Sequence, residues 1–444
     1  MNRSGRDVAR TAGVLATLSL AGLGPAGAQE PAEQTGVVGH WVGTLSAMGT
    51  ELRLVFHIER NGEDGLSGTM DSPDQGAYDL RLSSVTDEDG AVVFSLASLG
   101  GEYRGQISGD GSSIEGSWSQ GGATFPLPLE RSTAEALAPE RPQEPRPPLP
   151  YESVDVQIDN DEAAVRLAGT LTIPSGEGPH PAVVLISGSG PQDRDETVFG
   201  HRPFLVLADH LTRNGIAVLR YDDRGIGEST GDFALATTLD FVSDALAAAA
   251  FLADRPEVDA GRVGLVGHSE GAIVAPVAAN RSEGIAFAVL LASTGVNGRE
   301  LLVMQGKAIN RASGIPEAVI EERARVQAEL LDAVMAAEDN LVAAEAARAI
   351  LASAGVTGAA ADGQIRAILT PWMAFFLTYD PLPALRQMSV PVLALNGELD
   401  AQVPPAENLG PVEQALREGG NEDVTAEVMP GLNHLFQSAE TGAP

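Results

Sequence analysis

Apolar and polar residues alternate with a period of two through the first part of the chain. From about residue 37 to residue 131, short alternating runs such as Leu52–Ile58 are separated by turns rich in Gly and Asp. Such runs, without a helical stripe between them, are typical of an antiparallel sandwich or barrel. We therefore predict a small all-β domain over 36–131 and a Pro-rich exposed linker over 132–150.

The pattern changes in residues 151–444, where apolar strand-like runs alternate with helical segments. This alternation predicts a mostly parallel α/β sheet with helices on its faces. The central runs are continuously apolar, as expected for strands buried on both faces. The predicted strands are 153–158, 166–173, 182–186, 217–221, 262–266, 286–291, 390–395 and 424–428, and the predicted helices include 204–214, 239–253 and 272–279. An Ala-rich stretch without strands predicts a helical cap over about 298–385.

The first 28 residues have the layout of a secretory signal peptide. Arg3, Arg6 and Arg10 precede a short apolar stretch, and Ala26–Ala28 offers a cleavage site. That stretch is shorter than the roughly 20 residues that cross a bilayer, and no later segment is apolar enough to do so. The sequence therefore predicts a periplasmic or secreted protein with no membrane span in the mature chain.

Composition excludes several kinds of chemistry. The chain has no cysteine, so it has no disulfide, thiol nucleophile or Cys-ligated zinc. No cluster of His, Asp and Glu has metal-ligand spacing, and we expect no metal. Lys+Arg total 28 against 61 Asp+Glu, a net charge of -33, which argues against sequence-independent binding of nucleic acid.

The G-x-S-x-G pattern occurs twice, centred on Ser229 and on Ser269. Ser269 directly follows a predicted strand and precedes a predicted helix, which is the context that exposes a serine hydroxyl above a sheet. Ser229 lies several residues beyond its strand, and no helix starts at once after it. We therefore predict Ser269 as the nucleophile.

A serine nucleophile needs a base and an acid that orients the base, in the order Ser, acid, His on this kind of sheet. Beyond His268, which is expected to pack or hydrogen-bond behind the turn, His434 is the one histidine after Ser269. It follows the last predicted strand, so we predict it as the base. For the acid we favour Asp400, just after the strand at 390–395, with Glu398 as a rival and Asp380 as a weaker one.

An acyl-transfer site also needs N–H donors for the developing oxyanion. The residue after the nucleophile, Glu270, should supply one backbone N–H, and the loop after the third strand should supply the other. In that loop, residues 187–191, we choose Ser189, with a plain glycine turn as the alternative. The loop lacks the Lys-Ser/Thr pair of a phosphate-binding loop.

Two further groups lie near the predicted site. The charged runs Asp193–Asp195 and Asp222–Arg224 are expected to pair and stiffen the neighbouring loops. The aromatic run Trp372–Phe376 in the predicted cap either lines an acyl pocket or packs in the core.

These motifs resemble the α/β-hydrolase superfamily, and more narrowly the secreted bacterial esterases with an N-terminal β domain that are grouped with serine-aminopeptidase-type hydrolases. The resemblance runs from about residue 151 to the end, on Ile186–Asp195, Asp222–Ser229, Gly267–Gly271, Asn396–Asp400 and Gly431–His434, and it extends to Leu52–His57 and Asp71–Gly76 of the β domain. The chain departs from the family where Ser187 stands for a frequent His. A second departure is that ten residues follow His434, where relatives usually have a helix.

The resemblance implies an α/β-hydrolase fold and hydrolysis of a small carboxylic ester by Ser269, Asp400 and His434, without a cofactor. Because the helical insertion should shape a modest acyl pocket, we expect short acyl groups. Two alternatives stay open: a serine peptidase or aminopeptidase on the same triad, and a catalytically inert protein that binds components of the cell envelope.

Overall fold

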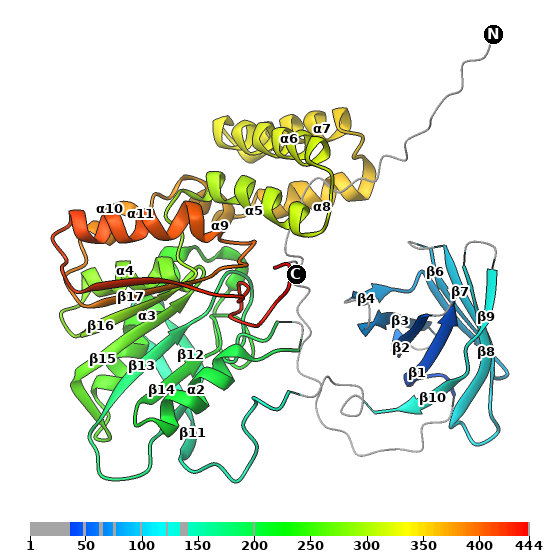
Figure 1. Cartoon of the computed structure of the whole chain (residues 1–444), viewed down its shortest axis with the longest axis horizontal. Helices are drawn as coiled ribbons and strands as arrows, with labels where there is room; N and C mark the ends of the chain where they lie inside the picture. The colour runs from blue at the N-terminus through cyan, green and yellow to red at the C-terminus, as the bar shows by residue number, and fades with distance from the viewer. Residues whose placement is uncertain are drawn as a thin grey trace. The chain divides into compact units, whose positions relative to one another are not determined.

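The structure is a computed structural model of the chain. It describes residues 36–47, 50–61, 65–73, 77–97, 100–120, 123–133, 141–198 and 200–442. The predicted signal peptide over 1–28 lies outside the described residues, as do residues 134–140 of the predicted linker. Two compact units make up the chain, with the division after Arg141, inside the Pro-rich segment (Figure 1).

The N-terminal unit is a single curled antiparallel sheet, a half-barrel around one apolar core. Its described strands are β1 (Gly39–Ala47), β2 (Thr50–Asn61), β3 (Gly65–Ser72), β4 (Ala77–Arg81), β5 (Ser84–Glu88), β6 (Ala91–Leu96), β7 (Gly101–Ile107), β8 (Ser113–Gln120), β9 (Ala123–Pro126) and β10 (Leu129–Ser132). They follow the order β4-β3-β2-β1-β10-β8-β7-β6-β5, and β9 pairs with β8. Alternate residues such as Trp41, Phe56 and Trp118 fill the core. The predicted all-β fold is therefore confirmed, as one curled sheet rather than two stacked sheets.

The second unit is built on a mixed sheet of eight described strands. These are β11 (Glu152–Asn160), β12 (Val165–Ile173), β13 (His180–Ile186), β14 (Ala217–Tyr221), β15 (Val258–His268), β16 (Phe287–Leu291), β17 (Val392–Gly397) and β18 (Val424–Met429), in the order β11-β12-β14-β13-β15-β16-β17-β18. β12 is antiparallel to both of its neighbours, and all later pairs are parallel. The predicted strands agree closely. The main difference is β15, which begins at Val258 rather than Arg262 because Val258 pairs with His180 across an irregular register.

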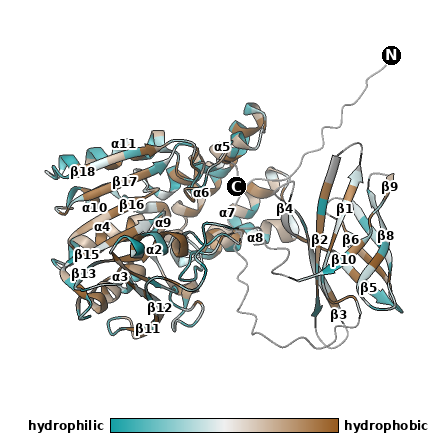
Figure 2. Ribbon diagram, turned by 60° about the horizontal axis from the view of Figure 1, so that its bottom comes forward, coloured by the Kyte–Doolittle hydropathy of each residue, from teal (hydrophilic) through white to brown (hydrophobic). Residues whose placement is uncertain are grey.

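Helices cover both faces of this sheet. α2 (Pro203–Arg213) packs through Phe204 and Ala208 on side chains such as Val183 and Leu185 of β13. The opposite face, which carries Val184, is covered by α3 (Thr238–Ala253), α4 (Gly271–Arg281), α10 (Leu382–Arg386) and α11 (Pro405–Glu418). Neighbouring residues of one strand pack against helices on opposite faces, so both faces of the central strands are apolar. The central strands are accordingly coloured largely brown, for hydrophobic residues, in Figure 2.

The cap is helical, as predicted, and lies over one edge of the sheet (Figure 1). It consists of α5 (Gly298–Ala312), α6 (Glu317–Ala336), α7 (Asn340–Ser353), α8 (Gly358–Ile368) and α9 (Pro371–Thr378). These helices share a core of buried residues such as Leu330, Leu351 and Ile365. None of the helices in the described ranges is long and apolar enough to cross a bilayer.

Candidate active site

Ser269 occupies a sharp turn between β15 and α4. Its φ is 53°, in the left-handed region that a residue with a side chain seldom adopts. A Cβ placed on Gly267 would lie 2.0 Å from the Gly271 carbonyl oxygen, and one on Gly271 would lie 2.1 Å from the Ile186 carbonyl oxygen. Both glycines are therefore needed for the backbones of strand, turn and helix to approach each other.

Ser229, the centre of the second G-x-S-x-G pattern, has a structural role. Its hydroxyl donates to the Asp222 carbonyl oxygen (2.7 Å) and accepts from the Ala168 N–H (2.9 Å). The side chain is buried, so it ties the loop after β14 to β12.

Asp400 and His434 are in direct contact at the carboxyl ends of β17 and β18. The distance from Asp400 Oδ2 to His434 Nδ1 is 2.8 Å, and both side chains are buried. The other oxygen, Asp400 Oδ1, accepts the backbone N–H groups of Gln402 (2.8 Å) and Val403 (2.7 Å). These two donors fix the carboxylate, which then holds His434 with Nδ1 protonated and Nε2 able to accept a proton.

The rival acids are engaged elsewhere. Glu398 accepts the Gly431 N–H at 2.8 Å, and Asp380 accepts the Leu382 N–H at 3.0 Å. Neither forms a hydrogen bond or ion pair with His434 within the described part of the chain.

His434 and Ser269 both lie at the carboxyl ends of the parallel strands. The ring of His434 is 4.7 Å from that of His268, centroid to centroid, and His268 directly precedes Ser269. No hydrogen bond joins the Ser269 hydroxyl to His434 among the described residues. Catalytic hydrogen bonds of this kind are often long without substrate and tighten when substrate is bound.

The predicted oxyanion donors are both open. Ser189 and Glu270 line one cavity together with Ser269. Over the ranges that the structure describes, neither backbone N–H donates to a protein acceptor. The loop that carries Ser189 lies against the turn, since a Cβ on Gly188 would be 3.3 Å from Ser269 Cβ. Two unpaired N–H groups beside a serine hydroxyl can stabilise a developing negative charge.

Glu196 forms a buried link between three loops, and the sequence reasoning missed it. Its Oε1 accepts the Gly188 N–H (2.6 Å) and lies 2.8 Å from Nδ1 of His268, whose Nε2 is 2.9 Å from the His434 carbonyl oxygen. A carbonyl oxygen only accepts, so His268 donates through Nε2. Burial lowers the pKa of His268, but the Glu196 carboxylate outweighs it and the pKa is raised. The pair therefore joins the turn to the loops of Ser189 and His434.

The Glu270 side chain also faces the site. Its Oε1 accepts from Trp372 Nε1 and from the Thr238 hydroxyl, each at 2.6 Å. Burial raises the pKa of Glu270 to about 7, against the two hydrogen bonds, which lower it. Trp372 belongs to the cap, so this carboxyl links the turn to α9.

The charged runs brace the neighbouring loops, as the sequence analysis expected. The Arg194 guanidinium donates to Asp222 at 2.8 Å. Asp223 accepts from the Ser187 hydroxyl (2.9 Å) and the Gln192 N–H (3.0 Å), and burial raises its pKa well above the usual range. Ser187, which stands at a position that is often His in relatives, therefore forms a hydrogen bond to the loop after β14.

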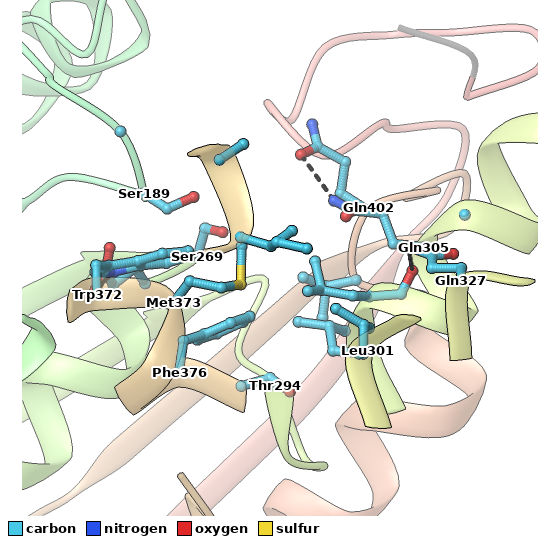
Figure 3. A pocket seen from close by; sticks show the side chains of 18 of the residues that line it. Ser189, Ser269, Thr294, Leu301, Gln305, Gln327, Trp372, Met373, Phe376 and Gln402 are labelled. Carbon is cyan, nitrogen blue, oxygen red and sulfur yellow. Dashed lines mark hydrogen bonds between the residues drawn. The ribbon is translucent and has the colours of Figure 1, made fainter. Parts of the chain in front are cut away.

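A cavity of about 330 Å³ opens from Ser269 under the cap (Figure 3). Its wall is mainly apolar, and Asp400 and His434 do not contribute to it. Trp372, Met373 and Phe376 line it, while Met373 and Phe376 also belong to the buried cap core, so this run both lines a cavity and packs in the core. No group of three or more metal-ligating side chains occurs among the residues that the structure describes.

Comparison with known proteins identifies the family of the chain. Residues 202–440 match the family described as serine aminopeptidase, S33. The chain is 30% identical over 297 residues to esterase EstD of Thermotoga maritima, covering 66% of this chain and 62% of that relative.

Solved structures of low identity are also similar. An esterase of Pyrococcus furiosus, Pf2001, is 17% identical with a TM-score of 0.43, covering 64% of this chain and 84% of that one. The α/β hydrolase GrgF of a Penicillium species is 19% identical with a TM-score of 0.42, covering 64% and 91%.

Proposed function

The chain belongs to the serine aminopeptidase (S33) family of α/β hydrolases, and from this premise we propose that it is a serine esterase that cleaves small carboxylic esters. One observation carries the proposal: the buried contact of 2.8 Å between Asp400 and His434, at the sheet edge that also holds Ser269 in its strained turn. Similarity to an esterase over 66% of the chain supports the choice of reaction.

In the proposed mechanism the Ser269 hydroxyl attacks the ester carbonyl and gives its proton to Nε2 of His434. Asp400 orients the imidazole and stabilises the imidazolium that forms. His434 then protonates the departing alcohol, and a water molecule activated by the same imidazole cleaves the acyl-enzyme.

The backbone N–H groups of Ser189 and Glu270 are proposed to bind the oxyanion in both steps. Each such donor contributes about 10²- to 10³-fold in kcat in known enzymes. The Glu196–His268 pair holds Gly188, next to Ser189, and thereby keeps the first donor in place.

We propose short acyl groups as substrates, because about 330 Å³ lies at the lower end of the usual range for ligand cavities. We also propose that the protein acts in the periplasm or outside the cell, on the basis of the signal-peptide pattern in residues 1–28.

A fluorophosphonate probe tests the nucleophile, because it labels an activated serine covalently. We expect labelling of the wild type and of Ser229→Ala, which removes the serine of the other G-x-S-x-G pattern, and no labelling of Ser269→Ala. A folded wild-type protein that stays unlabelled would overturn the proposal and favour the inert binding protein.

The substrate class requires a second measurement. The kcat/KM values for p-nitrophenyl esters of rising chain length are compared with those for aminoacyl anilides. We expect turnover of the esters, with a preference for short acyl groups. Preferential cleavage of the anilides would make the protein a peptidase on the same residues.

A further inference from the structure

One guanidinium lines the cavity without a carboxylate partner. Arg323 of α6 belongs to the wall that also contains Ser269, and it is half-buried. Its guanidinium donates a hydrogen bond to the amide oxygen of Asn310 on α5. Across the described residues, no Asp or Glu forms an ion pair with it. Its positive charge is therefore uncompensated where it faces the cavity.

The other basic residues of the cap show how unusual this is. Five of them pair with carboxylates at 2.6 to 2.9 Å: Arg299 with Asp332, Lys307 with Glu321, Arg311 with Glu317, Arg325 with Glu322, and Arg348 with Asp362. Carboxylates are plentiful in a chain with 61 Asp and Glu. Among the described cap residues, Arg366 also lacks an ion pair, but it is exposed and lies outside the cavity wall.

Arg323 contacts α5 near the C-terminal end of that helix, at Asn310. Leu301 packs with Met373 and Phe376 beside the turn, and Asn310 comes nine residues later on the same helix, about 13 Å farther along its axis. Figure 3 shows Gln305 and Gln327 across the cavity from Ser189 and Ser269.

The charges of the described wall are thus separated. Its one carboxyl group, Glu270, stands at the Ser269 end and is held by Trp372 and Thr238. Apart from Arg323, the polar wall residues on α5 and α6 are the neutral amides Gln305, Asn310 and Gln327. Asn310 Nδ2 donates to the Gly306 carbonyl oxygen (2.6 Å), and Gln327 Nε2 donates to the Leu302 carbonyl oxygen (3.1 Å).

We propose that, besides the short acyl groups proposed above, the site accepts longer acyl groups when their far end carries a second, ionised carboxylate, and that Arg323 binds this carboxylate. The acyl group, rather than the alcohol, is the part of the ester that enters the cavity. The residues of the oxyanion donors line the cavity, whereas His434, which protonates the departing alcohol, does not. A planar guanidinium matches a carboxylate with two parallel hydrogen bonds, and partial burial strengthens them. The inference rests on the proposed esterase function and names its substrate class.

The test compares two series of p-nitrophenyl esters of equal length, one ending in a methyl group and the other in a carboxylate. Acyl chains of about six, eight and ten carbons vary how far the second carboxylate reaches from Ser269 towards Arg323. The readout is the ratio of kcat/KM for the two esters of one length, in wild type, Arg323→Met, Arg323→Lys and Arg366→Met.

We expect wild type to prefer the carboxylate-ended ester at one of these lengths. Arg323→Met should lower the ratio about 10- to 100-fold, as expected for a lost hydrogen-bonded charge pair. Arg323→Lys should keep part of the preference, and Arg366→Met should keep all of it. A wild type that prefers the methyl-ended ester at every length, or equal effects of Arg323→Met and Arg366→Met, would overturn the inference.

A binding measurement separates this inference from the proposed function. Calorimetry with the free eight-carbon dicarboxylate and with octanoate reports binding without turnover. If no ester is cleaved but the dicarboxylate binds to wild type and not to Arg323→Met, the anion site stands and the esterase proposal falls. If the dicarboxylate binds no better than octanoate, the anion site falls.

Discussion

The carboxyl of Glu270 gives the stability of the α/β unit a pH dependence that can be calculated from the structure. In the folded protein burial raises its pKa from the ordinary 4.5 to about 7. A raised pKa means that the stability contributed by the neutral group is fully present below about pH 4.5 and is lost as the pH rises through about 7. Raising the pKa by this amount corresponds to about 3 kcal/mol.

The perturbation is Glu270→Gln, which cannot ionise and keeps an oxygen that accepts from Trp372 and Thr238. Between about pH 5 and about pH 8, wild type should lose about 2 to 3 kcal/mol relative to this variant. Taking the difference between the two proteins cancels the titration of distant groups, whose effects are additive.

Urea unfolding followed by the helical circular-dichroism signal measures this difference, because the described helices all belong to the unit that begins at Pro142. Curves at about pH 5, 6, 7 and 8 give the trend. A difference that stays flat, or a wild type that gains stability on the variant as the pH rises, would show that burial does not hold this carboxyl neutral.

Two further predictions follow from contacts around His434. Asp400→Asn should lower kcat about 10⁴-fold. The Gln402 and Val403 N–H groups would hold the oxygen of the new amide and turn its NH₂ towards Nδ1 of His434, which leaves the imidazole proton on Nε2. A kcat within tenfold of wild type would contradict this. Glu196→Ala should destabilise the folded protein by about 3 to 5 kcal/mol in urea unfolding, because it breaks a buried pair. That loss should be larger at about pH 5 than at about pH 9, since the raised pKa of His268 contributes stability at low pH, and the reverse order would contradict the ion pair.

The fold was readable from the sequence because its signals are local. Residues 182–186 form a continuous apolar run, and the strand is found there because β13 is covered by helices on both faces. The boundary of β15 was predicted too late because its polar start, from Val258, is held by pairing with a distant strand rather than by its own pattern.

The G-x-S-x-G turn at Ser269 was separated from the one at Ser229 by what immediately precedes and follows it, and the structure gives Ser229 a buried structural role. His434 and Asp400 were predicted from chain order and strand ends, because the carboxyl ends of parallel strands lie on one side of the sheet, and the structure brings the two side chains into contact. These predictions needed the G-x-S-x-G motif, the order of the residues along the chain, and the alternation of strands and helices.

Tertiary structure alone decided which distant side chains meet. Nothing within residues 193–196 shows that Glu196 turns inward to His268, since that contact depends on a loop far away in sequence. The exposure of Arg323 to the cavity likewise depends on how α6 packs against α5. Periodicity along a chain records burial and turns, whereas a contact between remote residues is set by packing, and packing leaves no signal in the spacing of one sequence.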